Sequence, residues 1–402
     1  MFLDNMIKTT KTGRSFSILH GFKITIVICF VSTSLSIFFS YLDLFQVRCY
    51  FQQTKLFEIQ KKNTTIQTSL DRNNEDFMGD TNESDPNLYT TSYPRIAWLM
   101  SYPNSGTSFT MKLVGLGGNK TVATNYGLEA DTSYSTSNVP LYPHSPHGPY
   151  LLNPKKSLPK QYILTKTHCG GRCADCSPKG YIETKTSFMN RCAQGSRRNH
   201  SLTLGKEIVW YDPEIVERVI HLIRNPFDNL VSNFHLVHHE KAKKSKNNNE
   251  KSKNWLNTYP NDMHGFRKWC LDENRKHAEE EKELLSSEIV DIFERNNIPC
   301  HAHFYRYAKW HDFAIAVTHE LKLPALVIVY EEYGDKFNMT ATKIFDFLEM
   351  EPISGTVPPF VGGKTYIDYF TESEREDAMM LVKACIENEK TWNLVQRYQE
   401  DG

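Results

Sequence analysis

The stretch IAWLMSYPNSGTSFTMKLVGL, residues 96–116, places three kinds of local sequence in a row. Residues 96–100 form a continuous apolar run, which is typical of a strand buried on both faces. Residues 101–108 combine Pro, Asn and Gly with hydroxyl side chains and predict a tight turn. A helix that begins after this turn would direct its first backbone N–H groups at an anion. A surface turn that caps an ordinary helix fits this stretch equally well.

Three further apolar runs predict the rest of a sheet. They are residues 162–165, 216–223 and 325–330, and helical stretches separate them. Strands that alternate with helices are joined by right-handed crossovers, which build a parallel sheet flanked by helices. The sequence therefore predicts an α/β fold for residues 95–402.

A second motif, RNPFDNLVS at residues 224–232, follows one of these runs directly. Arg224 falls at the carboxyl edge of a predicted strand, where open parallel sheets bind ligands. Pro226 can begin a helix that carries Ser232 in its second turn. A guanidinium and a hydroxyl together suit a phosphate group. The alternative interpretation is an ion pair between Arg224 and Asp228 that supports the start of the helix.

Four segments resemble, in the same order, the motifs of sulfotransferases that use 3′-phosphoadenosine-5′-phosphosulfate (PAPS). SYPNSGTSF resembles their 5′-phosphosulfate loop, and RNPFDNLVS resembles their 3′-phosphate motif. Lys166-Thr167-His168 resembles their K-T-H segment. ALVIVYEEY at residues 325–333, with the helical stretch after it, resembles their Y-E-D segment. The resemblance extends over residues 96–348 and implies a P-loop-like fold.

The resemblance also implies roles for individual residues. Lys166 would stabilise charge on the leaving oxygen, and His168 would accept the proton of the acceptor hydroxyl as general base. A hydrogen-bonded structural imidazole remains the alternative for His168. The residues that match the cofactor-binding positions of the family are Asn104, Ser105, Gly106, Thr107, Ser108, Phe109, Arg224, Ser232 and Tyr330.

The chain departs from the family pattern at two places. Asn104 stands where the loop usually has Lys or Arg, and we expect Lys166, or second Lys112, to replace that cation. A late R-K-G phosphate motif has no clear copy, and only Gly363 and Lys364 offer a counterpart. Sulfuryl transfer relies on positioning and cations, by analogy with phosphoryl transfer, so no metal is required.

The N-terminal region predicts a membrane anchor. Residues 24–42 contain no charged side chain, and a helix of this length spans about 28 Å, close to the thickness of a bilayer core. Basic residues precede this run, so residues 1–23 would be cytoplasmic and the rest lumenal. Residues 43–94 are polar and predict a disordered stem. The layout resembles that of Golgi sulfotransferases, a single-pass type II arrangement; a cleaved signal peptide is the alternative.

Cysteines and glycosylation sequons agree with a lumenal catalytic domain. Eight of the nine cysteines lie outside the predicted anchor, and in an oxidising lumen we expect disulfides. Cys169, Cys173, Cys176 and Cys192 could instead hold zinc, although we favour disulfides here as well. The sequons of the predicted glycoprotein begin at Asn63, Asn82, Asn119, Asn199 and Asn338.

The net charge of the chain is zero, but one segment is strongly basic. The 47 basic and 47 acidic residues cancel, which argues against a nucleic-acid partner. Residues 241–254, KAKKSKNNNEKSKN, are rich in Lys and Asn and predict a solvated loop. The alternative for this segment is a basic surface that binds an anionic glycan.

Together these observations predict a Golgi sulfotransferase that transfers a sulfuryl group from PAPS to a hydroxyl or amine of a glycan or glycoprotein acceptor. A homodimer is compatible with the sequence. A lumenal glycosyltransferase is one alternative, but the chain contains no Asp-x-Asp motif. The other alternative is a non-catalytic, sulfotransferase-like binding module, which the substitution at Asn104 favours.

Overall fold

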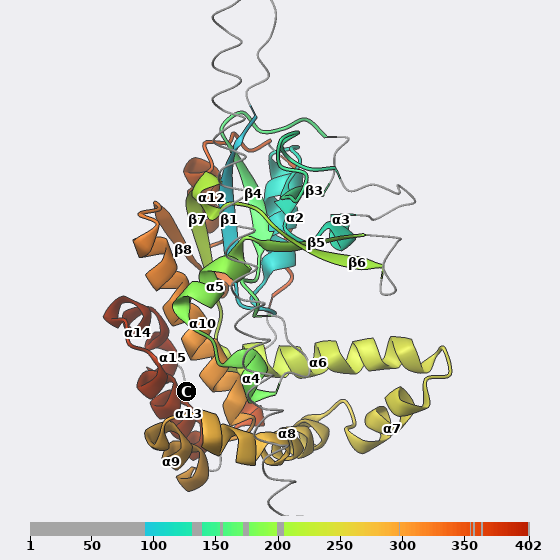
Figure 1. Cartoon of the computed structure of the whole chain (residues 1–402), viewed down its shortest axis with the longest axis vertical. Coiled ribbons are helices and arrows are strands. Elements are labelled where there is room, and N and C mark those ends of the chain that lie inside the picture. Colours follow the sequence, from blue (N-terminus) through green and yellow to red (C-terminus); the bar gives the residue numbers. More distant parts are fainter. Residues whose placement is uncertain are drawn as a thin grey trace, which may run out of the picture. The chain divides into compact units, whose positions relative to one another are not determined.

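A mixed α/β domain with a central, mainly parallel sheet is the main feature of the computed structural model (Figure 1). The strands of this sheet are β1 (Arg95–Ser101), β2 (Ala123–Thr124), β3 (Tyr150–Leu151), β4 (Tyr162–Thr167), β7 (Val216–Ile223) and β8 (Ala325–Val329). Their spatial order is β3-β2-β4-β1-β7-β8. The structure describes residues 93–130, 139–152, 156–171, 177–198, 205–296, 298–353, 355–356, 358–362 and 365–400.

The pairing confirms the predicted parallel sheet. β1 lies between β4 and β7 and is parallel to both, and β8 continues the parallel pairing beyond β7. The four strands predicted from apolar runs are therefore these four neighbours. β2 is parallel to β4, and β3 closes that edge as an antiparallel strand. A separate antiparallel ribbon contains β5 (Gln194–Arg198) and β6 (Lys206–Trp210).

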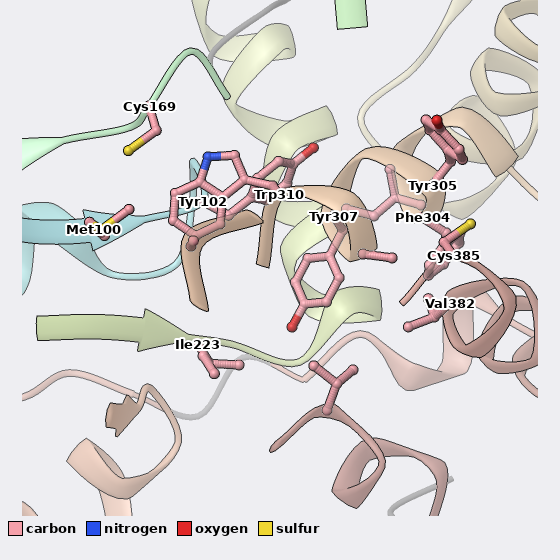
Figure 2. Packing of buried hydrophobic residues seen from close by; sticks show 14 of the residues in the cluster. Met100, Tyr102, Cys169, Ile223, Phe304, Tyr305, Tyr307, Trp310, Val382 and Cys385 are labelled. Carbon is pink, nitrogen blue, oxygen red and sulfur yellow. The ribbon is translucent and has the colours of Figure 1, made fainter. Parts of the chain in front are cut away.

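Helices cover both faces of the sheet, as the alternation within each strand requires. Ala97 and Leu99 of β1 pack in a cluster with α2 (Thr107–Gly117) and α12 (Phe337–Phe347). Trp98 and Met100 face the other side, where α10 (His301–Glu320) contributes four large aromatic side chains, Phe304, Tyr305, Tyr307 and Trp310. Figure 2 shows part of this second cluster, with Tyr102 beside residues of α10. The predicted α/β fold, a parallel sheet flanked by helices, is thus confirmed for the described residues, whereas the predicted N-terminal transmembrane helix and stem lie outside them.

The remaining helices lie beside the sheet and in the lower part of Figure 1. They are α3 (Gly127–Ala130), α4 (Pro178–Tyr181), α5 (Lys185–Cys192), α6 (Pro226–Ser245), α7 (Glu250–Thr258), α8 (Met263–Leu284), α9 (Ser287–Arg295), α11 (Glu332–Asp335), α13 (Glu372–Cys385), α14 (Glu389–Val395) and α15 (Arg397–Glu400). Two short 3₁₀ segments are Pro213–Ile215 and Ile367–Tyr369.

The solvated loop predicted for residues 241–254 is wrong. α6 continues to Ser245, and α7 begins at Glu250, so only a short turn separates the two helices. Lysine is a good helix former, which extends α6 further than a loop composition suggests. Asn249 caps α7, because its side chain accepts a hydrogen bond from the Ser252 N–H at 2.9 Å. Trp255 of α7 then packs on α6, 6.2 Å from the ring of Phe234.

Several predictions fall on residues that the structure does not describe. These are the cytoplasmic tail and anchor at residues 1–42, the stem up to residue 92, and the sequons at Asn63, Asn82 and Asn199. Among the described residues, no helix is both long and apolar enough to span a bilayer.

Two disulfides are present in the described part of the chain. Cys169 pairs with Cys192, and Cys270 pairs with Cys300. The expectation that every cysteine outside the anchor would be oxidised is wrong for Cys385, which is a free, buried thiol whose pKa burial raises to about 12. The first pair replaces the zinc alternative at these two positions, while Cys49, Cys173 and Cys176 lie outside the described residues.

Candidate functional site

The loop between β1 and α2 has the geometry of an anion cradle. Asn104 and Gly106 adopt left-handed backbone angles, with φ of 67° and 95°. A Cβ at Gly106 would lie 2.3 Å from a ring carbon of Tyr330, so both the backbone angle and the close approach require glycine. Gly106 precedes α2 without a side-chain cap, and the first turn contains no acidic residue. The first N–H groups of α2 therefore have no acceptor within their own helix and suit an anion.

Arg224 brings the second motif against this loop. It follows β7 directly and is only 7% exposed. Its Nη1 donates a hydrogen bond to the Asn104 carbonyl oxygen at 2.7 Å, and its guanidinium lies 4.5 Å from the centre of the Tyr330 ring. Its Nε is buried and has no hydrogen-bond partner among the described residues. A buried donor without an acceptor is costly, so a ligand oxygen at this point would stabilise the arrangement.

The ion pair proposed as the alternative role of Arg224 does not form. The carboxylate of Asp228 accepts a hydrogen bond from the Tyr366 N–H at 2.7 Å, and no Arg224–Asp228 ion pair occurs in the described structure. Burial raises the pKa of Asp228, and the nearby Arg224 opposes that rise. The helix start is supported instead by Asn225, whose side chain accepts from the Phe227 N–H at 2.9 Å.

Ser232 lies in the second turn of α6, one turn after Asp228. It is half-buried, and its hydroxyl makes no hydrogen bond to any described residue. The Ser232 side chain is therefore not engaged within the described structure, and its predicted role in binding a phosphate stays a prediction.

Two amides of α6 hold the loop in place, and the sequence analysis missed both. Asn229 donates from Nδ2 to the Pro103 carbonyl oxygen at 2.7 Å and to Ser105 Oγ at 3.1 Å. Asn233 accepts a hydrogen bond from the Asn104 side chain at 3.1 Å. The available signal was Asn229 directly before the apolar pair Leu230 and Val231, since a buried amide needs polar partners.

Some hydroxyl residues of the loop are buried and contact the protein, and one is exposed and could contact a ligand. Thr107 Oγ1 lies 2.7 Å from Ser101 Oγ, so this pair joins the end of β1 to the start of α2. Ser108 is exposed in the first turn of α2. Ser105 is fully buried beneath the loop.

An aromatic wall adjoins the loop on the α12 side. Phe109 lies 5.0 Å from Tyr333 and 4.9 Å from Phe360, measured between ring centres. Phe360 also lies 5.4 Å from Tyr330. Three distant segments thus form one apolar surface that suits a flat base. Phe360 was not predicted, and the suggested Gly363 and Lys364 lie outside the described residues.

His168 is held at the end of β4 by its ring and by its backbone. Its Nδ1 lies 2.8 Å from the Ser101 carbonyl oxygen, and its ring stacks on Tyr126 at 5.8 Å. A carbonyl oxygen only accepts, so in the neutral ring Nδ1 carries the proton and Nε2 is the basic nitrogen. This tautomer fits the predicted general base. The Trp310 Nε1–H donates to the His168 carbonyl oxygen at 2.8 Å.

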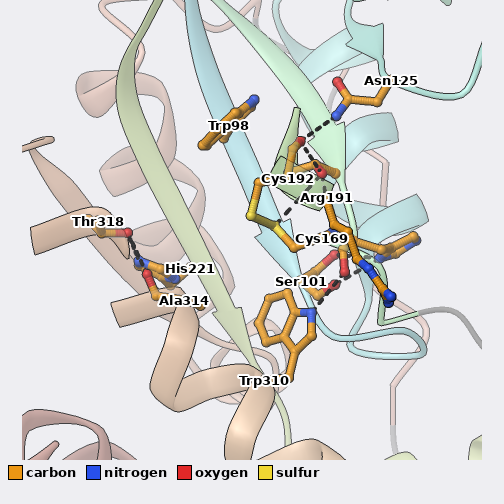
Figure 3. The surroundings of a disulfide bond; sticks show 12 residues. Trp98, Ser101, Asn125, Cys169, Arg191, Cys192, His221, Trp310, Ala314 and Thr318 are labelled. Atoms are coloured by element: carbon orange, nitrogen blue, oxygen red, sulfur yellow. Dashed lines mark hydrogen bonds between the residues drawn. A yellow bond between two sulfur atoms is a disulfide. The ribbon is translucent and has the colours of Figure 1, made fainter. Parts of the chain in front are cut away.

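The Cys169–Cys192 disulfide fixes the same segment (Figure 3). The Cys192 carbonyl oxygen accepts hydrogen bonds from Thr167 Oγ1 at 2.8 Å and from Asn125 Nδ2 at 2.6 Å. Figure 3 shows these bonds on one side of the disulfide and Ser101 and Trp310 on the other. A cross-linked support beside His168 is thus confirmed.

Lys166 has an acidic partner that the sequence analysis did not anticipate. Its Nζ lies 2.8 Å from a carboxylate oxygen of Glu129 in α3, and only 13% of its side chain is exposed. Lys112, the second candidate for the missing loop cation, is exposed on α2. The cation that contacts the loop at Asn104 is Arg224.

Comparison with known proteins gives one informative match. The family profile described as "Sulfotransferase domain" matches residues 213–361, which include Arg224, Ser232 and Tyr330. No curated protein matches the chain. Mouse sulfotransferase SULT7A1, in a crystal structure complexed with PAP, is similar at 14% identity and a TM-score of 0.32, with 76% of this chain and 89% of that chain covered. Such a slight structural likeness carries no weight by itself. Over residues 213–361, therefore, the chain matches the sulfotransferase domain.

Proposed function

We propose that the protein is a PAPS-dependent sulfotransferase. The observation that carries this proposal is the contact of Arg224 with the loop before α2, because it joins two motifs that are far apart in the sequence. The uncapped start of α2 and the unpartnered Nε of Arg224 supply donors for two anionic groups. The match of residues 213–361 to the sulfotransferase domain supports the same reaction class.

Each part of the site fits one part of the co-substrate. The N–H groups from Gly106 onward would hold the 5′-phosphate, and Arg224 with Ser232 would hold the 3′-phosphate. Phe109, Tyr330 and the rest of the aromatic wall would pack against the adenine. The co-substrate supplies the activated sulfuryl group, and the described residues contribute binding and orientation.

His168 would act on the acceptor, and Lys166 would act on the leaving group. The Ser101 carbonyl oxygen accepts from His168 Nδ1, so Nε2 is the basic nitrogen that would accept the proton of the acceptor hydroxyl. Lys166 would stabilise negative charge that develops on the leaving oxygen, once it exchanges its contact with Glu129 for the ligand.

The proposal also covers the acceptor and the cellular compartment. We infer a glycan or glycoprotein acceptor in the Golgi lumen, with the chain held by residues 24–42 as a single-pass type II anchor. The two disulfides support an oxidising compartment.

The first experiment measures binding of 3′-phosphoadenosine-5′-phosphate (PAP) by calorimetry. We expect Arg224→Ala to weaken PAP binding about 10- to 100-fold, the effect of removing a hydrogen-bonded charge. Arg224→Lys keeps the charge but loses the Nε donor, so it should bind with intermediate affinity. Wild-type protein that fails to bind PAP would overturn the proposal and leave the glycosyltransferase alternative.

The second experiment measures transfer of labelled sulfate over a panel of glycan and peptide acceptors. We expect His168→Ala to reduce turnover about 10²- to 10⁴-fold while PAP binding is retained. His319→Ala is the matched control, because His319 is exposed at the far end of α10. Binding of PAP without turnover on any acceptor would favour the non-catalytic module, for which the Lys166–Glu129 pair is a specific argument.

A further inference from the structure

A buried histidine lies behind the phosphate loop and belongs to none of the sequence motifs. His303 is in the first turn of α10 and is 8% exposed. Its Nε2 is 3.2 Å from Oδ1 of Asn229, and its ring lies edge-on to Tyr102 at 5.5 Å. Asn229 in turn contacts the loop, so the two residues link α10 to Ser105 through α6.

The backbone fixes the orientation of the Asn229 amide. The Asn229 side chain is fully buried, and one of its terminal atoms lies 2.7 Å from the Pro103 carbonyl oxygen. A carbonyl oxygen can only accept, so the atom that faces it must be the nitrogen. The amide oxygen therefore faces His303.

This orientation also fixes the tautomer of His303. An amide oxygen only accepts, so Nε2 of His303 must carry the hydrogen. Burial, with Arg306 nearby, lowers the pKa of His303 to about 3. The ring is therefore neutral at physiological pH, with its single proton on Nε2.

The second hydrogen of the Asn229 amide determines what Ser105 can do. It points to Ser105 Oγ at 3.1 Å, so Ser105 is the acceptor of this bond. Ser105 is fully buried, so this bond supports the loop from beneath, on the side away from a ligand. The Asn229 amide thus uses both of its hydrogens on the loop, one on Pro103 and one on Ser105.

We propose that His303 and Asn229 are positioning residues that hold the loop, through Pro103 and Ser105, in the conformation that binds the 5′-phosphate. The inference rests on the proposed function for the identity of the anion. The direction of the hydrogen bonds follows from the Pro103 carbonyl and does not depend on a ligand. With an acceptor-only group in place of Asn229, the Pro103 carbonyl would lose its donor and the loop would lose this support.

The test measures PAP affinity by calorimetry in variants of nearly equal size. Asn229→Asp replaces the donor with a carboxylate, and we expect PAP affinity to fall about 100-fold or more. His303→Phe removes the donor to Asn229 and should weaken PAP binding about 10-fold. His303→Gln restores an N–H near the same place and should recover most of that loss.

His311→Phe is the matched control. His311 lies on the same helix, is 2% exposed, and its Nε2 has no hydrogen-bond partner among the described residues. We expect its PAP affinity to equal that of the wild type. Urea unfolding of all four variants separates loss of folding from loss of affinity. Equal PAP affinity of wild type, His303→Phe and Asn229→Asp would overturn the inference.

Nitrogen-15 NMR of the ligand-free protein provides a second readout, which tests the direction of the His303–Asn229 hydrogen bond directly. We expect His303 to be neutral with its proton on Nε2. A proton on Nδ1 would overturn the inference even if PAP binds. Failure of the wild type to bind PAP, with the Nε2 proton present, would instead contradict the proposed function alone.

Discussion

Gly106 shows how one backbone position can control the whole site. Its φ of 95° is a left-handed angle, and a Cβ at this position would lie 2.3 Å from a ring carbon of Tyr330. Tyr330 in turn supports the guanidinium of Arg224 from 4.5 Å. A side chain at Gly106 would therefore disturb both motifs, although it would touch only one ring.

We predict that Gly106→Ala destabilises the protein by about 1–2 kcal/mol, the cost of a left-handed alanine, and abolishes measurable PAP binding. Thermal unfolding and calorimetry check the two effects. Gly334→Ala is the control, since a Cβ there meets no atom within 4 Å. PAP binding by Gly106→Ala at wild-type affinity would contradict the assigned role of the loop.

At the scale of elements, α6 connects the candidate site with a basic surface. Between residues 238 and 254 the chain has six Lys and two Glu, although its net charge is zero. Lys243 follows Ser232 by eleven residues, which places it on the same face of α6 about 17 Å further along. Both Lys243 and Lys244 are exposed. The alternative stated for this segment, a surface for an anionic glycan, thus remains a prediction although the segment is helical.

We predict that replacing Lys243, Lys244, Lys246 and Lys251 by Gln raises the KM for a sulfated glycan acceptor several-fold and weakens its salt dependence. Turnover on a short neutral acceptor and PAP affinity should not change, because the site itself is intact. A fourfold Gln variant with the wild-type KM at low salt would exclude the glycan surface and leave a plain solvated hairpin.

At the scale of the whole molecule, buried histidines couple stability to pH. Burial lowers the pKa of His221 to about 4 and the pKa of His303 and His311 to about 3, from an ordinary value of 6.5. The unfolded chain therefore binds protons that the folded chain excludes, so stability falls as pH falls below 6.5. Asp228 and Glu331 have raised pKa values and act in the opposite direction.

We predict that each of these histidines lowers the free energy of unfolding by about 1.4 kcal/mol when the pH falls from 7.5 to 5.5. Urea unfolding at both pH values measures the loss. His311→Phe should reduce the pH dependence by the share of one histidine. An unchanged pH dependence in this variant would show that His311 is not neutral in the folded protein.

Local sequence was sufficient to predict the order and type of the central elements. The apolar runs at residues 96–100 and 216–223 became β1 and β7, because a strand buried on both faces must be apolar at every position. The glycine-containing turn before α2 and Arg224 at the edge of β7 were likewise readable as an anion site, since their spacing from a strand places them at one edge. The hairpin of α6 and α7 was missed, because packing of Trp255 on Phe234 overrides a loop-like composition.

The sequence by itself determined a parallel α/β fold and two motifs that each suit a phosphate. Only the tertiary structure decided that Arg224 meets Asn104, that Lys166 is paired with Glu129, and that His303 stands behind Ser105. The physical reason is the distance along the chain over which each interaction acts. Periodicity and turn chemistry act over a few neighbouring residues, whereas hydrogen-bond partners are chosen when distant segments pack together and every buried donor and acceptor needs a partner.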